Sequence, residues 1–132
     1  MDELATALGD GGVHRIDEQW ESLAGGYDGI STSTLNRLLV TDGHHHHQEV
    51  ARELQVRADP SSLLYACRAI DMGFSRLAYT ASEPEVLGKW YSWLLAGIGT
   101  DEATAAIERY SCSEVPGLVE AMRYRLSRLR KP

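Results

Sequence analysis

At 132 residues, with 43% hydrophobic and 24% charged residues and no run of about 18 apolar residues, the sequence predicts one soluble domain without a membrane span. The formal net charge is −6, but residues 1–122 hold all 19 acidic residues and only 8 of the 13 basic ones, a net charge of −11. Such an acidic body repels nucleic acid and anionic membranes and favours a basic partner.

The first predicted elements lie at the N-terminal end. Residues 1–13 end in a glycine-rich stretch, and we expect them to form a flexible arm or a short helix. Residues 14–132 are expected to form a single helical domain, whose first helix covers residues 14–24 and ends at a glycine pair. No basic start and apolar stretch of a signal peptide opens the sequence, which favours a cytoplasmic protein.

Three further helices are predicted in the first half of this domain. Ser33 or Thr34 can cap a helix that ends near Gly43. The next helix runs from about His46 to Arg57, and Pro60 suits the first position of the one that follows. The apolar spacing places the inward stripe of that last helix at Leu63, Leu64, Cys67 and Ile70.

The second half begins with an ambiguous segment, residues 74–80, and continues with three predicted helices. Ser82, Thr100 and Ser113 are placed to cap them. The inward positions of the middle helix are Ala103, Ala106, Ile107 and Tyr110. The inward positions of the last helix are Val115, Leu118, Val119, Met122, Leu126 and Leu129.

The helix that follows Ser82 carries an apolar stripe broad enough for a largely buried helix. We expect Trp90 in the core and Tyr91 or Trp93 partly exposed, where aromatic side chains often anchor a partner. Cys67 and Cys112 are too few for a disulfide framework, and each is expected to be a small buried hydrophobe.

Six to seven short helices joined by short loops predict an all-α fold of antiparallel hairpins. Each pair of helices with its loops takes up roughly 35–40 residues, close to the period of stacked two-helix repeats. Identity between the units is low, so periodicity alone leaves a compact bundle equally open.

Four consecutive histidines stand at the start of the helix that begins near position 46. If the segment is helical, His44 and His47 lie on one face, as two metal ligands would. No Cys-x-x-Cys or His-Glu-x-x-His motif accompanies them. We therefore favour the alternative that His44 and His47 cap and pack the helix start, with His45 and His46 in solvent and no metal bound.

The sequence does not predict catalysis. Most candidate serine and threonine nucleophiles stand where helix caps belong, and no Gly-x-Ser-x-Gly motif is present. The glycines lack the strand-turn-helix setting of a phosphate-binding loop. We therefore predict a protein that is not an enzyme and needs no cofactor.

The basic residues of the last ten positions suit the carboxyl end of a terminal helix, whose dipole favours cations. Tyr124 is the one aromatic residue among them, which is too few for a nucleic-acid surface, so no nucleic-acid partner is predicted. These basic residues are Arg123, Arg125, Arg128, Arg130 and Lys131.

The histidine segment and the turn after it resemble the HEAT-repeat-like proteins of bacteria. Positions 43–55 read Gly-His-His-His-His-Gln-Glu-Val-Ala-Arg-Glu-Leu-Gln, and positions 58–62 read Ala-Asp-Pro-Ser-Ser. That group carries Trp-His-x-x-His-Glu-Asp-Ile, then Leu-Gln and an Asp-Pro-x-Ser turn. His44 and His47 fall on its two histidine positions, whereas Gly43 replaces the tryptophan and Gln48-Glu49 replaces Glu-Asp.

Two later segments extend the resemblance. Positions 94–103 read Leu-Leu-Ala-Gly-Ile-Gly-Thr-Asp-Glu-Ala, similar to the group's Ala-Leu-Gly-x-Ile-Gly-Thr-x-Glu-Ala join, and positions 120–126 resemble its last repeat helix. The likeness covers about residues 31–129 and implies an α/α solenoid of about three helical hairpins. Deoxyhypusine hydroxylase holds two irons through His-Glu pairs on such repeats, but His47 is followed here by Gln48.

The resemblance implies no single activity, since many members look like immunity proteins encoded beside toxins and others are scaffolds. Our leading hypothesis is a non-catalytic interaction module, an immunity protein that neutralises a cognate toxin through an acidic surface. A nuclease with its basic cleft would be a natural target. The alternatives are a generic scaffold or adaptor subunit and a metal-binding domain using His44 and His47. The residues expected to contact the partner are Asp17, Glu18, Trp20, Glu21, Asp42, Glu49 and Glu53.

Overall fold

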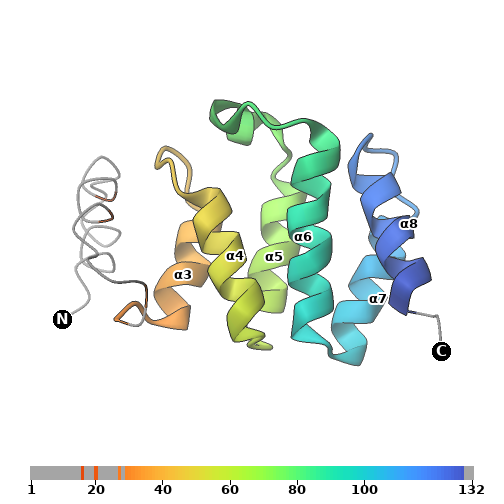
Figure 1. Cartoon of the computed structure of the whole chain (residues 1–132), viewed down its shortest axis with the longest axis horizontal. Coiled ribbons are helices and arrows are strands. Elements are labelled where there is room, and N and C mark those ends of the chain that lie inside the picture. Colours follow the sequence, from red (N-terminus) through yellow and green to blue (C-terminus); the bar gives the residue numbers. More distant parts are fainter. Residues whose placement is uncertain (1–15, 17–19, 21–26, 28, 130–132) are drawn as a thin grey trace.

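The computed structural model describes residues 29–129 together with Ile16, Trp20 and Tyr27, and this part of the chain contains helices and no strand (Figure 1). Its helices are α3 (Thr32–Leu39), α4 (His47–Arg57), α5 (Ser62–Asp71), the 3-10 helix η1 (Ser75–Thr80), α6 (Pro84–Ile98), α7 (Asp101–Tyr110) and α8 (Leu118–Leu129). The all-α prediction is confirmed. Among the described residues, no helix has both the length and the apolar character needed to cross a membrane.

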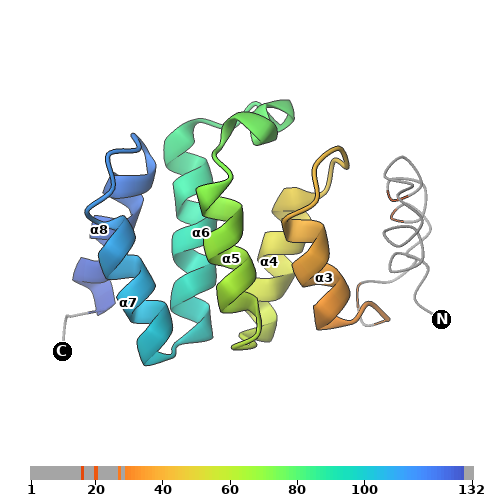
Figure 2. The ribbon, with the colours of Figure 1, turned by 180° about the vertical axis from the view of Figure 1, so that it is seen from behind.

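The helices form antiparallel hairpins, α3 with α4, α5 with α6 and α7 with α8, stacked side by side (Figures 1 and 2). Helices α4, α6 and α8 make one layer, facing the viewer in Figure 1, and α3, α5 and α7 make the other, facing the viewer in Figure 2. Short loops between consecutive helices make those helices antiparallel. As a result, α4, α6 and α8 run parallel to one another.

The hydrophobic core lies between the two layers, and both contribute leucine and isoleucine side chains to it. Each such side chain contributes about 1.5 to 3 kcal/mol when it leaves water. The residues without exposed surface include Leu35, Leu38, Leu39, Leu54, Leu94, Leu95 and Ile107.

The helix predicted near the N-terminus can be compared with the structure at two described residues. Ile16 and Trp20, from the helix predicted over residues 14–24, are helical and buried. The arm predicted over residues 1–13 lies outside the described residues.

The predicted N-terminal caps of α3 and α7 can be compared with the observed ones. Thr100 caps α7 as predicted, its hydroxyl accepting a hydrogen bond of 3.1 Å from the backbone N–H of Ala103. At α3 the cap is Ser31, which accepts from the N–H of Thr34 at 3.1 Å, so the prediction of Ser33 or Thr34 is wrong. The apolar spacing indicates which face of a helix is inward, but it does not fix the turn at which the helix begins.

The predicted caps of α6 and α8 are also wrong. Glu83, not Ser82, precedes α6, and Pro84 occupies the first position, where its missing N–H costs nothing. Ser113 lies in the turn before α8 and accepts from the N–H of Val115 at 3.0 Å. Because α8 starts only at Leu118, Val115 lies outside it and is exposed rather than inward.

Three other residues that the spacing placed inside are exposed: Leu64, Cys112 and Leu129, whereas Cys67 is half-buried. The spacing identifies a helix face, but only a neighbouring helix can cover it. The edges of a stripe stay in solvent where the neighbour does not reach them. Helix α5 also begins at Ser62, so Pro60 belongs to the turn before it.

Tyr91 is buried and stacks against Phe74, although it was one of the two aromatic residues expected to stay partly exposed. Burial raises the pKa of its phenol to about 12, and in the described part of the chain the hydroxyl has no hydrogen-bond partner. Tyr91→Phe removes this hydroxyl while keeping the ring, so we expect equal stability or a gain of about 1 kcal/mol. Urea denaturation measures the change, and a loss above about 1 kcal/mol would show that the hydroxyl is satisfied.

Candidate functional site

His44 and His47 lie buried beside the first turn of α4, with 1% of the surface of each exposed. Their rings stack with centroids 4.0 Å apart, so the packing part of the prediction is confirmed. The capping part is not, because the residue that precedes α4 is His46 and it makes no side-chain capping hydrogen bond. His45 is exposed as expected. His46 is half-buried rather than in solvent, because its ring stacks on that of Trp20 at 4.6 Å.

All four ring nitrogens of this histidine pair are used inside the chain. Nε2 of His44 donates to the carbonyl of Leu38 at 2.7 Å, and its Nδ1 accepts from the backbone N–H two residues on at 3.1 Å. Nε2 of His47 donates to the carbonyl of Thr41 at 2.8 Å, and its Nδ1 accepts from the Tyr79 hydroxyl at 2.6 Å. Carbonyl oxygens only accept, so both rings carry their proton on Nε2.

The pair therefore ties the end of α3 to the start of α4. A metal ion bound to His44 and His47 would have to displace hydrogen bonds that already use every ring nitrogen. In the described part of the chain, no group of three or more histidine, cysteine or acidic side chains is placed to hold a metal ion. The geometry thus favours packing over metal binding at these two residues.

Burial is the main cause that lowers the pKa of His47 from 6.5 to about 3. The neighbouring His44 ring and the Arg76 guanidinium lower it further, while the Thr41 carbonyl and the Asp42 carboxylate act in the opposite direction. His47 is therefore neutral at physiological pH, in agreement with its hydrogen bonds. The role of His47 is therefore structural, and the folded environment disfavours the protonated ring.

The residues predicted to contact a partner are placed as follows. Trp20 is buried under the His46 ring. Asp42 accepts from Arg76 at 2.9 Å, and Glu49 accepts from Nδ1 of His46 at 3.0 Å. These acids are near the same end of the domain but already have partners within the chain. The predicted contact residues that lie outside the described residues are Asp17, Glu18 and Glu21.

Glu53 is held in the same way, by Arg57 one turn further along α4 at 2.9 Å. The Arg57 guanidinium also donates to the carbonyls of Ile30 at 2.7 Å and Tyr27 at 2.9 Å. Glu53 thus helps to orient a cation that fastens the segment before α3 onto α4. Contact between these acids and a partner stays a prediction.

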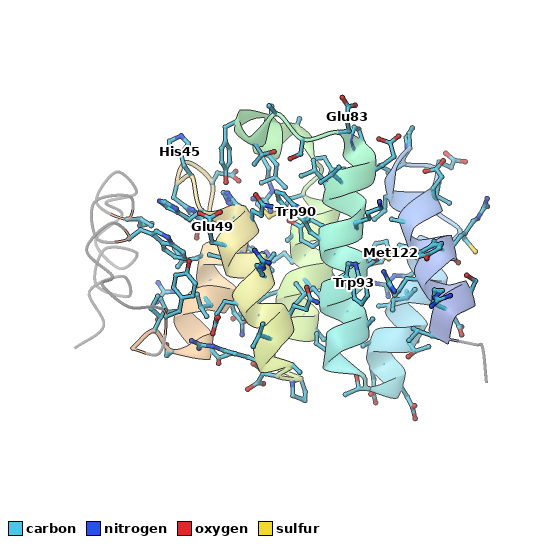
Figure 3. All side chains as sticks on the ribbon, in the orientation of Figure 1. His45, Glu49, Glu83, Trp90, Trp93 and Met122 are labelled. Atoms are coloured by element: carbon cyan, nitrogen blue, oxygen red, sulfur yellow. The ribbon has the colours of Figure 1, made fainter. Side chains whose placement is uncertain are left out.

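A different surface stands out on the layer formed by α4, α6 and α8. Trp93 is 48% exposed and Tyr124 is 59% exposed, while Trp90 is half-buried rather than part of the core. Trp90 and Trp93 both project from α6 (Figure 3). We call this surface the tryptophan face and define it as Arg52, Lys89, Trp90, Trp93, Tyr124 and Arg125.

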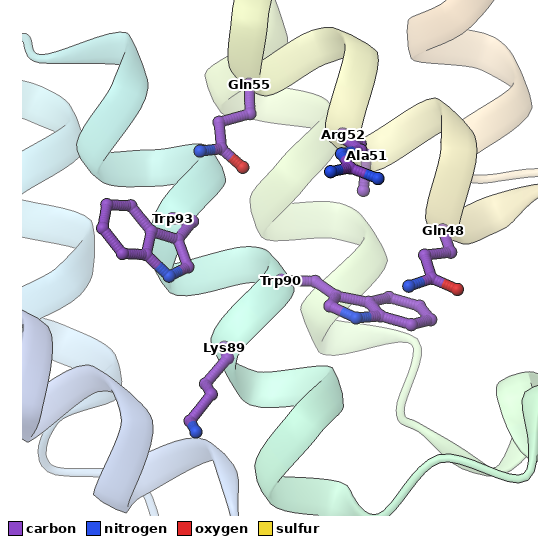
Figure 4. A pocket seen from close by; sticks show the side chains of 7 residues that line it. All are labelled: Gln48, Ala51, Arg52, Gln55, Lys89, Trp90 and Trp93. Atoms are coloured by element: carbon purple, nitrogen blue, oxygen red, sulfur yellow. The ribbon is translucent and has the colours of Figure 1, made fainter.

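Two adjoining hollows follow the tryptophan face. The first, of about 270 Å³, lies between α4 and α6, and in it Trp90 extends toward Gln48 (Figure 4). The second, of about 520 Å³, lies between α6 and α8. Lys89 and Trp93 line both hollows, which makes them one continuous surface across the three helices.

Arg125 is the residue of the tryptophan face that the sequence did not predict. It was assigned to the basic end of the last helix, but it lies inside α8, is 7% exposed and carries its guanidinium 3.5 Å from the ring centroid of Trp93. Its position three residues after the inward Met122 is the sequence signal that could have revealed it, because residues three apart share a helix face.

These groups suit non-covalent binding. Tryptophan, tyrosine and arginine are the residue types that dominate binding energy at protein interfaces. Ser92, which lines the larger hollow, is already engaged, since its hydroxyl donates to the carbonyl of Lys89 at 3.0 Å. Comparison of the chain with protein-family models, with curated proteins and with solved structures found no match, so its function has to be inferred from its own residues.

Proposed function

We propose that this protein is a non-catalytic interaction module, and more specifically a cytoplasmic immunity protein that binds and neutralises a cognate toxin. The observation that carries the proposal is the tryptophan face. Two large aromatic side chains are held open to solvent there beside hollows that a partner's side chains could fill. Tryptophan and tyrosine are enriched among the residues that contribute most to binding at protein interfaces.

The immunity role is supported by the resemblance of residues 31–129 to HEAT-repeat-like proteins. The net charge of −11 over residues 1–122 favours a basic toxin such as a nuclease. Asp42, Glu49 and Glu53 would have to exchange their bonds within the chain for bonds to the toxin. We therefore expect them to speed association more than to hold the complex together.

We expect the tagged protein to capture one stoichiometric partner from a lysate of its native host, with a chelator present throughout. Trp93→Ala should lower the recovery of that partner at least about tenfold, because tryptophan is enriched among the interface residues whose truncation weakens binding most. Leu64→Ala is the matched control, since it removes an exposed apolar side chain from α5 on the opposite layer. Mass spectrometry identifies the partner and quantitative blotting measures its recovery.

Expression of the captured partner alone tests the neutralising role. The proposal expects it to stop growth and expects co-expression of this protein to restore growth. A partner that is harmless when expressed alone would support a scaffold or adaptor subunit instead. A partner that is captured only when the chelator is left out would support metal binding through His44 and His47, and equal recovery by Trp93→Ala would contradict a role for the tryptophan face.

A further inference from the structure

Arg125 has an arrangement that its own helix does not explain. The side chain is more than nine-tenths buried, yet its Nε has no hydrogen-bond partner in the part of the chain that the structure describes. No described carboxylate forms an ion pair with its guanidinium. A buried cation is costly unless it is paired. The Nε atom is covered, whereas the two terminal nitrogens are not among the covered atoms without a partner, so an anion supplied from outside the chain would meet the terminal N–H groups.

Trp93 fixes the orientation of that cation. The guanidinium carbon lies 3.5 Å from the centroid of the indole ring, and the Tyr124 ring lies 5.6 Å away. Stacking satisfies the flat face of a guanidinium, but its N–H donors point outward in the plane of the group. Those donors match the two oxygens of a carboxylate.

The charges around the larger hollow indicate which end an anion would occupy. Lys89 lines it near Trp93, and neither Lys89 nor Arg52 of the adjoining hollow has an ion pair with a described carboxylate. The acids of the hollow lie toward the start of the helices. Glu85 precedes Trp93 by eight positions, roughly 12 Å along α6, and Glu120 accepts the N–H of Gly117.

An occupant of this hollow must also offer something apolar. The exposed ring surfaces of Trp93 and Tyr124 border the site of the cation, and the volume of about 520 Å³ is that of a ligand pocket rather than of an ion site. An acidic side chain next to an aromatic or aliphatic one meets both requirements. Free phosphate or another small anion would leave the aromatic surface in water.

We propose that the hollow between α6 and α8 receives an acidic side chain of the partner protein, its carboxylate on Arg125 and Lys89 and a neighbouring apolar side chain on Trp93. The proposal rests on the proposed function only in taking the occupant to be a protein segment. It adds a local acidic anchor to a partner whose overall charge is expected to be basic.

Two small peptides test the proposal on the unaltered protein. N-acetyl-Asp-Phe-amide carries the carboxylate and the ring, and N-acetyl-Asn-Phe-amide differs only in lacking the charge. We expect the aspartate peptide to shift the Nε–H signal of Arg125 and the indole signal of Trp93 in nuclear magnetic resonance spectra. Its Kd should be about tenfold lower than that of the asparagine peptide, and added salt should narrow the difference.

Variants then locate the effect. Arg125→Gln should abolish the difference between the two peptides, whereas Arg68→Gln, which removes an exposed cation from α5 on the other layer, should leave it unchanged. The peptide comparison on the wild-type protein needs no variant, so it remains decisive if Arg125→Gln folds poorly. Equal Kd values for the two peptides, or no shift of either signal at about 10 mM peptide, would overturn the proposal.

The outcome is separable from that of the proposed function. If the protein distinguishes the two peptides but captures no toxin, the proposed binding of an acidic side chain by the hollow is supported and the immunity role is contradicted. A captured toxin that binds Arg125→Gln as tightly as the wild type would keep the immunity role and overturn the acidic anchor.

Discussion

Gly117→Ala is expected to destabilise the protein by about 3 to 5 kcal/mol, a large part of the stability of a domain. Gly117 lies in the turn before α8 with φ +83°, a conformation that disfavours any side chain. A Cβ added there would stand 2.5 Å from the carbonyl carbon of Pro84 and 2.8 Å from the backbone nitrogen of Glu85. Backbone cannot yield as a flexible side chain does, so α8 would have to move away from α6.

Gly73→Ala is the matched control for this experiment. Gly73 also has a positive φ, +90°, but nothing lies within 4 Å of the position that its Cβ would take. Gly73→Ala should lower the free energy of unfolding by only about 1 to 2 kcal/mol, the cost of placing a side chain at a positive φ. Urea denaturation followed by circular dichroism measures both variants, and equal losses would show that the close approach of α6 and the α8 turn contributes nothing.

The free energy of unfolding is expected to fall by roughly 4 kcal/mol between pH 6.5 and pH 3 because of His47. The unfolded chain binds a proton on this ring below pH 6.5, whereas the folded protein resists it down to about pH 3. The stability contributed by the neutral ring is therefore fully present above pH 6.5 and is lost as the pH falls toward 3. The slope approaches about 1.4 kcal/mol for each pH unit in that window.

His47→Gln isolates this contribution from that of the acidic residues, which also titrate over part of the range. The variant should be less stable than the wild type above pH 6.5, because hydrogen bonds to Thr41 and Tyr79 are weakened, and its stability should change less with pH. His45→Gln changes an exposed neighbour whose ring meets Tyr79 edge-on at 5.0 Å, so its stability can differ slightly, but its change of stability with pH should follow that of the wild type. Parallel pH profiles for the wild type and His47→Gln would contradict the expected role of this ring.

The order and type of the helices were accessible from the sequence. Apolar residues at helical spacing predicted α4 to within one residue at its start, and the Thr100 cap placed α7. These features are local, since a helix closes its hydrogen bonds within four residues and a cap acts within three. The packing of His44 and His47 was also favoured correctly, and three of the four partners of their ring nitrogens are backbone groups within six positions, whereas the fourth is the Tyr79 hydroxyl, 32 positions away.

The candidate site, by contrast, depends on contacts between helices that are far apart in the chain. Trp93 and Arg125 are 32 positions apart and meet only because α8 lies alongside α6. The spacing from Met122 could mark Arg125 as inward, but no local pattern shows that it stacks on Trp93. The acids predicted to face a partner were read as free charges, yet Asp42 is paired with Arg76 of η1. Apart from η1, whose segment the sequence left ambiguous, the sequence by itself determined which of the described segments are helical and where the chain reverses, because these follow from short-range spacing and turn chemistry. Only the tertiary structure decided which side chains are covered, paired or left open, because that depends on which neighbour each helix face meets.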